Sequence, residues 1–299
     1  MEKVTVLLST YNGEKYLAEQ LDSIMNQKDV KVRLLVRDDG SSDSTSSILN
    51  TWSEKMELSW YSGNNLKPAK SFLDLLSNAG ESSYYSFSDQ DDYWLPEKLI
   101  AAIRALDNCK DVPALYFCQT QLVDEKLNKK KSIVINPYLT FGEALVYQFV
   151  SGCTMVFNSK LRDIVLSYKP SFVAMHDLWI YCIALAVGAK VIFDPQPHIL
   201  YRQHENNVIG LSTNKYKEWK NRLFGLFDRK GNERYEFARE IQQGYLSQMT
   251  VENRATIDTF IKAKTSIKYR LKLFFDDSFK CSDKKTYRLF KLAVILNRY

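Results

Sequence analysis

The 299-residue chain is 45% hydrophobic and 25% charged, an ordinary globular balance that excludes a disordered or fibrous protein. Its length fits one large domain, or a main domain with an appendage. No apolar run reaches the roughly 20 residues of a membrane-spanning helix, and the first residues lead directly into a strand pattern, so we expect a cytosolic protein. The five cysteines are scattered and form no metal-ligand pair, so we expect reduced, buried thiols.

The net charge of +6 conceals an asymmetry along the chain. Residues 1–212 carry 21 basic and 25 acidic residues, whereas residues 213–299 carry 20 and 10. A basic tail indicates contact with an anionic partner, such as a membrane surface or nucleic acid, or else a solvated helical face.

Strand and helix patterns alternate four times in the first third of the chain. Apolar, β-branched segments predict buried strands at 4–9, 32–36, 58–61 and 84–88. Each of these segments is followed by a helical pattern, the last of which starts at Pro96-Glu97. This alternation predicts a doubly wound α/β fold with a mostly parallel sheet.

The rest of the chain is predicted to add three strands and then only helices. The expected strands are 114–120, 151–158 and 190–194. His176-Asp177 opens an apolar helix, and His198–Gln203 leads into a polar loop. From residue 213 onwards, basic residues are interleaved with aromatic and aliphatic ones at helical spacing, including Trp219, Leu223, Phe224 and Phe227.

Polar side chains follow the ends of the predicted strands, where sheets of this class bind their ligands. Asp89-Gln90-Asp91-Asp92 is the most informative of these stretches, because three crowded carboxylates repel one another unless a cation is present. Extended backbone places Asp89 and Asp91 on one side, where one can meet a ligand hydroxyl and the other a hard cation such as Mg²⁺ or Mn²⁺. The alternative is an acidic turn in which Asp92 caps the next helix.

Glycine-rich phosphate loops are absent from the sequence, which argues against a Rossmann dehydrogenase or a phosphate-loop NTPase. A nucleotide diphosphate would then be bound through a metal ion rather than through glycine backbone. The motifs of this chain resemble those of the inverting glycosyltransferases of family 2, which have the GT-A fold. The resemblance covers residues 3–210 and rests on Ser9-Thr10-Tyr11-Asn12-Gly13, on the segment 36–45 and on the segment 88–94.

Within that family the chain is most similar to bacterial rhamnosyltransferases that build cell-surface polysaccharides. This narrower resemblance rests on segments 89–94, 176–179 and 201–207. It implies a GT-A domain over residues 1–211 and a basic α-helical region over residues 212–299. It also implies a metal-dependent inverting transfer, with L-rhamnose moving from dTDP-L-rhamnose to a hydroxyl of a lipid-linked or growing polysaccharide such as a capsule or cell-wall polymer.

The resemblance also implies roles for residues that would bind the nucleotide sugar. Ser9, Thr10 and Tyr11, with Asn12 beside them, would hold the base and ribose. Asp39 would accept a hydrogen bond from the base. Alternatively, Asp38 would accept this hydrogen bond; otherwise Asp38 would cap the adjacent turn. The remaining candidates, which would lie near the ribose or the diphosphate, are Asp89, Gln90, Arg202 and Lys70.

The resemblance further implies a metal site and a catalytic base. Asp91 would be the principal ligand of Mn²⁺ or Mg²⁺, and His204 would complete the site or lie exposed in its loop. Asp177 stands where the family carries the second residue of a Glu-Asp pair and would act as the general base, or cap the helix that follows. His176 takes the place of the glutamate and lies beside the sugar or the acceptor.

Two tryptophans and the basic tail complete the set of candidates. Trp94 and Trp179 would stack on a sugar ring or belong to the core. In the tail, Ile267, Leu271, Phe274 and Phe275 share one helical face and lysines lie off it, a pattern typical of helices that lie on anionic membranes. The alternatives are packing on the catalytic domain and a homodimer interface.

Other functions remain open at this stage. One alternative donor is a UDP-hexose or a UDP-amino sugar. The sequence does not distinguish these donors from dTDP-L-rhamnose, because sugar pockets are built from scattered loop residues. A catalytically silent subunit that binds nucleotide sugars is a second alternative. We expect no nucleic-acid binding, because the chain contains no recognised module for it. We place the protein at the inner face of the cell membrane, in contact with a saccharide acceptor.

Overall fold

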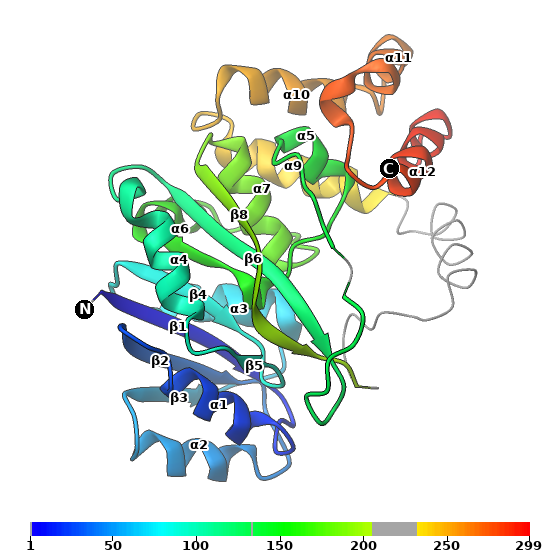
Figure 1. Ribbon diagram of the computed structural model, residues 1–299. Helices are drawn as coiled ribbons and strands as arrows, with labels where there is room; N and C mark the ends of the chain where they lie inside the picture. Colours follow the sequence, from blue (N-terminus) through cyan, green and yellow to red (C-terminus); the bar gives the residue numbers. More distant parts are fainter. Residues whose placement is uncertain (1, 133, 205–231) are drawn as a thin grey trace.

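The computed structural model describes residues 2–132, 134–204 and 232–299. The strands are β1 (Lys3–Thr10), β2 (Lys31–Asp38), β3 (Leu58–Ser62), β4 (Tyr84–Ser88), β5 (Tyr93–Trp94), β6 (Ala114–Val123), β7 (Val156–Asn158) and β8 (Lys190–Arg202). They form one sheet in the order β3-β2-β1-β4-β7-β6-β8-β5 (Figure 1). The strands at the β3 end, from β3 to β4, are mutually parallel, whereas β7 and β5 run antiparallel to their neighbours.

Helices follow the early strands as the sequence predicts. They are α1 (Leu17–Met25), α2 (Thr45–Ser53), α3 (Lys67–Asn78) and, after the short β5, α4 (Lys98–Leu106). The later helices and short 3-10 turns are η1 (Asp107–Cys109), α5 (Phe141–Val146), η2 (Gly152–Thr154), α6 (Ser159–Leu166), α7 (His176–Ala186), α9 (Glu233–Tyr245), α10 (Val251–Lys262), α11 (Ile267–Phe275), η4 (Asp277–Phe279) and α12 (Lys284–Ile295). The predicted α/β class and its alternating order are confirmed.

The sheet is the middle layer between two groups of helices, because alternate strand residues point to opposite faces. Val6 and Leu8 of β1 pack with α1, α2 and α4 on one face. Leu7 and Phe87 belong to the other face, where α3, α6 and α7 cover the sheet. All five cysteines are buried and unbonded to one another, as expected.

The topology brings the ends of β1, β2 and β4 together. Parallel pairing sets Thr10 beside Asp38 and Leu8 beside Ser88, so the turns after these strands leave the same edge of the sheet. The chain runs outward from β1 through β2 to β3 and then crosses back to β4 on the other side of β1. Such a switch point opens a crevice at the carboxyl ends of the strands.

Two strand predictions need correction. The strand expected over 151–158 is shortened to Val156–Asn158, because η2 turns the chain where Gly152 passes close to His176. A Cβ atom on Gly152 would lie 2.4 Å from His176 Nε2. The strand expected over 190–194 continues through the predicted loop to Arg202, and irregular register against β6 between Cys118 and Gln121 accommodates it.

The C-terminal helices share the core of the α/β layers. Phe237, Ile241 and Phe260 belong to the same buried cluster as Phe72 and Trp179. In the described residues, every helix is too short or too polar to cross a membrane. The predicted domain boundary at residue 211 and the tail residues Trp219, Leu223, Phe224 and Phe227 lie outside the described residues.

The shared core predicts that the tail helices unfold together with the sheet. Phe260 of α10 is fully buried, and its ring lies 5.1 Å from the ring of Tyr299. Phe260→Ala should therefore lower the free energy of unfolding by about 3–5 kcal/mol, the usual cost of emptying a buried aromatic site. Denaturant unfolding followed by tryptophan fluorescence and by circular dichroism measures this loss.

A matched control is Val251→Ala on the same helix, because that side chain is 84% exposed and should change stability by less than about 0.5 kcal/mol. The two spectroscopic transitions should coincide in the wild-type protein and in both variants. A separate early transition of the helices in the wild type would contradict the shared core.

Candidate active site

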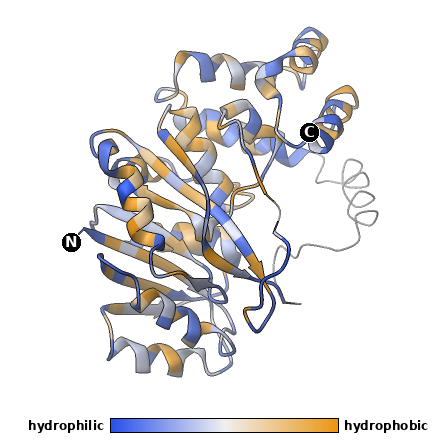
Figure 2. Cartoon of the chain, viewed as in Figure 1, coloured by the Kyte–Doolittle hydropathy of each residue, from blue (hydrophilic) through white to orange (hydrophobic). Residues whose placement is uncertain are grey.

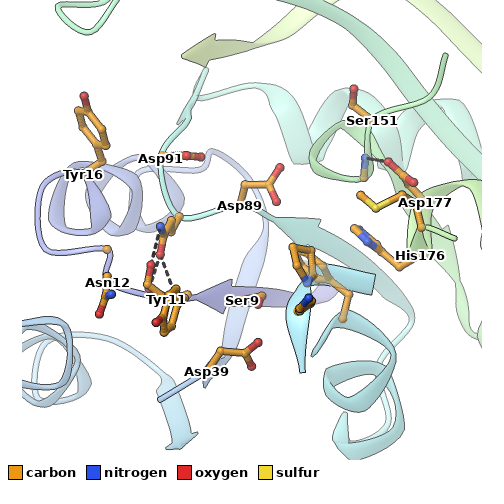
Figure 3. Close-up of a pocket in the computed structure, with 18 of the residues that line it drawn as sticks. Ser9, Tyr11, Asn12, Tyr16, Asp39, Asp89, Asp91, Ser151, His176 and Asp177 are labelled. Carbon is orange, nitrogen blue, oxygen red and sulfur yellow. Dashed lines mark hydrogen bonds between the residues drawn. The ribbon is translucent and has the colours of Figure 1, made fainter. Parts of the chain in front are cut away.

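A cavity of about 630 Å³ opens at the carboxyl ends of β1, β2 and β4. Figure 3 shows that its walls come from the turn after β1, the acidic turn after β4 and the start of α7. The predicted site residues that line it are Ser9, Thr10, Tyr11, Asn12, Asp39, Asp89, Gln90, Asp91, His176, Asp177 and His204. Residues from opposite ends of the sequence thus meet around one space.

Gln90 joins the turn after β1 to the acidic turn. Its Oε1 accepts hydrogen bonds from Thr10 Oγ1 (2.6 Å) and from the Tyr11 backbone nitrogen (2.8 Å), and its Nε2 donates to the Tyr11 carbonyl (3.2 Å). Asn12 has a φ of 49°, and its Oδ1 accepts from the Ser42 nitrogen (2.9 Å). These contacts fix the loop and leave the Tyr11 side chain 49% exposed at the cavity.

Asp39 and Asp38 are neighbours with different surroundings. Asp39 lines the cavity, forms an ion pair with Arg37 and accepts from the Leu66 nitrogen at 3.1 Å. Asp38 lies outside the cavity, where Ser41 and Ser62 donate to its carboxylate. Asp38 is therefore not placed to bind a nucleotide in the cavity. Its oxygens hold the turn together, which matches the alternative prediction that Asp38 caps the turn.

The acidic turn divides its three carboxylates between the cavity and the interior. Asp89 and Asp91 line the cavity, whereas Asp92 is 1% exposed and accepts from the Arg202 backbone nitrogen at 3.1 Å. Burial, then Asp91 and Asp177, raise the pKa of Asp89 to about 7. Burial, then Asp91 and Asp89, raise the pKa of Asp92 well above its usual range. The turn therefore favours a cation that relieves this repulsion.

Two sets of side chains here are able to bind a metal ion. Asp91 Oδ2 lies 2.9 Å from His204 Nε2 at the cavity, and the His204 ring stacks on Tyr16. Among the described residues, Asp89, Asp92 and Cys153 also bring ligand atoms within 4.8 Å of one another. Burial raises the pKa of the Cys153 thiol well above its usual range, and a protonated thiol is a poor ligand. The oxygen and imidazole donors of Asp91 and His204 are a better fit to Mn²⁺ or Mg²⁺.

Asp177 faces Asp89 from the opposite wall (Figure 3). Its Oδ2 accepts from the Gly152 nitrogen at 3.2 Å and its Oδ1 from the Leu178 nitrogen at 2.7 Å. Burial raises the pKa of Asp177 to about 6, although these backbone donors oppose the shift. The helix cap is Met175, so Asp177 lies in the first turn and is not the N-cap residue.

His176 lies beside Asp177 at the same wall. Its ring stacks on Phe72 with centroids 4.0 Å apart, and its side chain is only 3% exposed. Burial lowers the pKa of His176 to about 3, so the imidazole is neutral at working pH. The wall therefore combines one carboxylate with a neutral, largely apolar neighbour.

Four of the candidate binding residues do not line the cavity. Arg202 is buried, donates from Nε to the Asp91 carbonyl at 2.8 Å and forms an ion pair with Glu19, so it supports the acidic turn from behind. Lys70 is exposed outside the cavity. Trp94 lies under Lys98, whose Nζ is 3.5 Å from its ring, and Trp179 is fully buried in the core. Both tryptophans therefore belong to the core, which was the alternative prediction for them.

The cavity also contains residues that the motifs did not indicate. Lys67 supplies positive charge at the wall, and Lys15 lies there paired with Glu125 at 2.8 Å. Asn65, Phe72 and Tyr201 also line the cavity. Lys67 is the first residue of α3 and has a φ of 62°. Pro68, a residue favoured in the first turn of a helix, is a sequence signal for this helix start, but it does not indicate that Lys67 lines a cavity.

The chain is similar in sequence to known proteins. The family model described as "Glycosyl transferase family 2" matches residues 5–165. The chain is 32% identical to "dTDP-rhamnosyl transferase RfbG" of Shigella flexneri over 70% of this chain and 77% of that protein. It is 23% identical to the Escherichia coli protein "UDP-Glc:alpha-D-GlcNAc-diphosphoundecaprenol beta-1,3-glucosyltransferase WfaP", over 73% and 83%.

A solved structure supports the fold. The structure of Staphylococcus aureus TarS residues 1–349 in complex with UDP-GlcNAc superposes with a TM-score of 0.58 at 17% identity. The superposition covers 99% of this chain and 93% of that one.

The metal assignment makes a direct prediction. Asp91→Asn should weaken Mn²⁺ binding by about tenfold or more, because a carboxylate ligand of a hard cation is replaced by a neutral amide. Titration calorimetry or electron paramagnetic resonance with a nucleoside diphosphate present measures the affinity. Lys70→Ala, outside the cavity, is the control and should bind normally. Unchanged Mn²⁺ affinity in the Asp91 variant would remove this residue from the site.

Proposed function

The chain belongs to glycosyl transferase family 2, and on that basis we propose that it transfers a sugar from a nucleotide-sugar donor to a saccharide hydroxyl with inversion at the anomeric carbon. The fold is the GT-A fold that the motifs predicted. The observation that carries the proposal is the position of Asp177, which faces Asp89 and Asp91 across one cavity. A base and a phosphate-binding side are thereby separated by the space that a sugar would occupy.

Asp177 acts as the general base in this proposal. Its carboxylate accepts the proton of the acceptor hydroxyl while that oxygen forms a bond to the anomeric carbon. The bond from the anomeric carbon to the donor phosphate oxygen breaks, and its electron pair leaves with the nucleoside diphosphate. A pKa of about 6 makes Asp177 a stronger base than an exposed aspartate, yet leaves it ionised at neutral pH. This single inversion requires only one carboxylate, unlike the pair that glycosidases use.

The opposite wall binds the nucleoside diphosphate. Asp91 and His204 would hold Mn²⁺ or Mg²⁺, which supplies charge neutralisation for the leaving diphosphate. Lys67 adds positive charge to the same cavity, whereas Lys15 lies in its wall with its charge paired to Glu125. Tyr11 offers a partly exposed ring to the base, and Asp39 offers a carboxylate as its hydrogen-bond acceptor.

L-Rhamnose carried by dTDP is the donor that we propose. The Shigella flexneri relative is named as a dTDP-rhamnosyl transferase. Rhamnose is a 6-deoxy sugar, and its methyl group needs an apolar wall such as Phe72 and Met175 provide beside His176. The alternative is a UDP-hexose, because the Escherichia coli relative is named for UDP-Glc.

The acceptor in this proposal is a lipid-linked or growing surface polysaccharide at the inner face of the cell membrane. The Escherichia coli relative is named for an acceptor that carries diphosphoundecaprenol. A lipid-linked acceptor stays at the membrane, so the enzyme must reach it there. This requirement is separate from the chemistry of the cavity.

A thermal-shift panel of nucleotide sugars tests the donor. With Mn²⁺ present, dTDP-L-rhamnose should raise the unfolding temperature more than UDP-glucose or UDP-GlcNAc at the same concentration, because a ligand that binds more tightly stabilises the native state more. At a hundred times its Kd, a ligand stabilises the native state by about 2.7 kcal/mol. Omission of Mn²⁺ should reduce the shift. A shift with UDP sugars alone would retain the enzyme class and overturn the donor, and the absence of any shift would contradict nucleotide-sugar binding.

The base assignment predicts the pH dependence of transfer. Because Asp177 must be ionised, kcat/KM should fall about tenfold per pH unit below pH 6 and level off above it. Asp177→Asn should lose about 10²–10⁴-fold in kcat while calorimetry shows unchanged donor affinity. Near-normal turnover of this variant, or a flat profile between pH 5 and pH 7, would show that another group takes the proton.

A further inference from the structure

The last two helices expose a row of apolar side chains. Ile267, Leu271 and Phe275 recur every four residues on α11 and are 73%, 57% and 73% exposed. On α12, Leu292, Ile295 and Leu296 are also exposed. We call these six residues the outer tail face. In Figure 2 hydrophobic segments alternate with hydrophilic ones along both helices.

Packing inside the protein does not account for the outer tail face. The opposite sides of the two helices already supply buried residues, Leu273 from α11 and Phe290 and Val294 from α12. The helices also contact each other, since Lys291 Nζ lies 4.9 Å from the ring of Phe274. The exposed row is therefore additional to the face that attaches the helices to the core.

Basic side chains accompany the exposed apolar row. Residues 255–299 contain 11 basic and four acidic residues. The exposed basic residues on the two helices are Lys268, Lys272, Lys284, Lys285 and Arg288.

The acidic residues offset little of this charge. Asp258 pairs with Lys262 on the same helix at 2.8 Å. Asp283 caps α12 by accepting from the Thr286 nitrogen, and Asp276 caps η4 by accepting from the Ser278 nitrogen. Asp276 and Asp277 follow Phe275 at the end of α11, but the five exposed basic residues leave the surface along the apolar row with a net positive charge.

We propose that the outer tail face docks on an anionic membrane surface. Its apolar side chains would enter the boundary between head groups and acyl chains, while the lysines and Arg288 meet anionic head groups. A second copy of the chain is a poorer partner, because it would bring the same positive charge to the interface. The inference rests on the proposed function, because an enzyme with a lipid-linked acceptor must work at a membrane surface.

Vesicle sedimentation with the full-length protein tests the proposal. Vesicles that contain phosphatidylglycerol and phosphatidylcholine should bind at least about tenfold more tightly than vesicles of phosphatidylcholine alone, and added salt should weaken the binding because it screens the charges. Failure to bind anionic vesicles would overturn the proposal.

Two sets of variants locate the contact. Ile267→Ser combined with Leu271→Ser and Phe275→Ser, and separately Lys268→Gln combined with Lys272→Gln, should each weaken binding by about tenfold or more. Val251→Ser is the matched control, since it removes an 84% exposed apolar residue from α10 and should bind like the wild type. Circular dichroism confirms that each variant is folded. Unchanged binding in both tail variants, or a wild-type dimer that only the tail variants dissociate, would overturn the assignment.

Transfer to a short, soluble acceptor separates this inference from the proposed function. The tail variants should keep wild-type kcat with the soluble acceptor and lose activity only with a vesicle-borne acceptor. Soluble transfer without vesicle binding would overturn the docking face alone. Vesicle binding without any transfer would overturn the proposed function and leave the docking face standing.

Discussion

The structure depends on a crowding of carboxylates at the edge where β1, β2 and β4 end. Parallel pairing brings the turns after these strands together, and α7 adds Asp177 from the opposite wall. Such a cluster is costly unless each carboxylate has its own compensation. Arg37 pairs with Asp39, His204 contacts Asp91, and the backbone donors at Gly152 and Leu178 serve Asp177. The repulsion that remains is greatest at Asp89, which faces the cavity where a metal ion and a diphosphate would bind.

The sequence predicted this edge well because its signals are local. A β-branched apolar run followed by polar residues marks both the strand and the turn that leaves it, so the acidic turn and the turn after β1 were placed correctly. Local signals were insufficient where the partner is distant. The contrast between Asp38 and Asp39 depends on Ser62 of β3, and the burial of Arg202 depends on Glu19 of α1. No pattern around residue 202 contains that information.

The tail shows a similar limit of sequence periodicity. The pattern on α11 predicted an apolar face with lysines lying off it, but a period alone does not tell which face meets the protein. In the structure, Leu273 points into the core, whereas Ile267 and Leu271 remain exposed beside the basic residues. The predicted packing on the catalytic domain and the predicted surface contact are therefore compatible, because the two belong to different sides of the same helix.

The imidazole of His176 has an electrostatic consequence for the neighbouring carboxylate of Asp177. A second carboxylate at this position would place a like charge next to Asp177 in a buried wall and would raise its pKa further. Burial, opposed by the backbone donors, already raises that pKa to about 6. Burial also keeps His176 neutral, so no imidazolium charge lowers the pKa of Asp177 again, and this carboxylate is ionised at neutral pH but more basic than an exposed aspartate. The neutral imidazole thus adds no second charge to the wall beside Asp177.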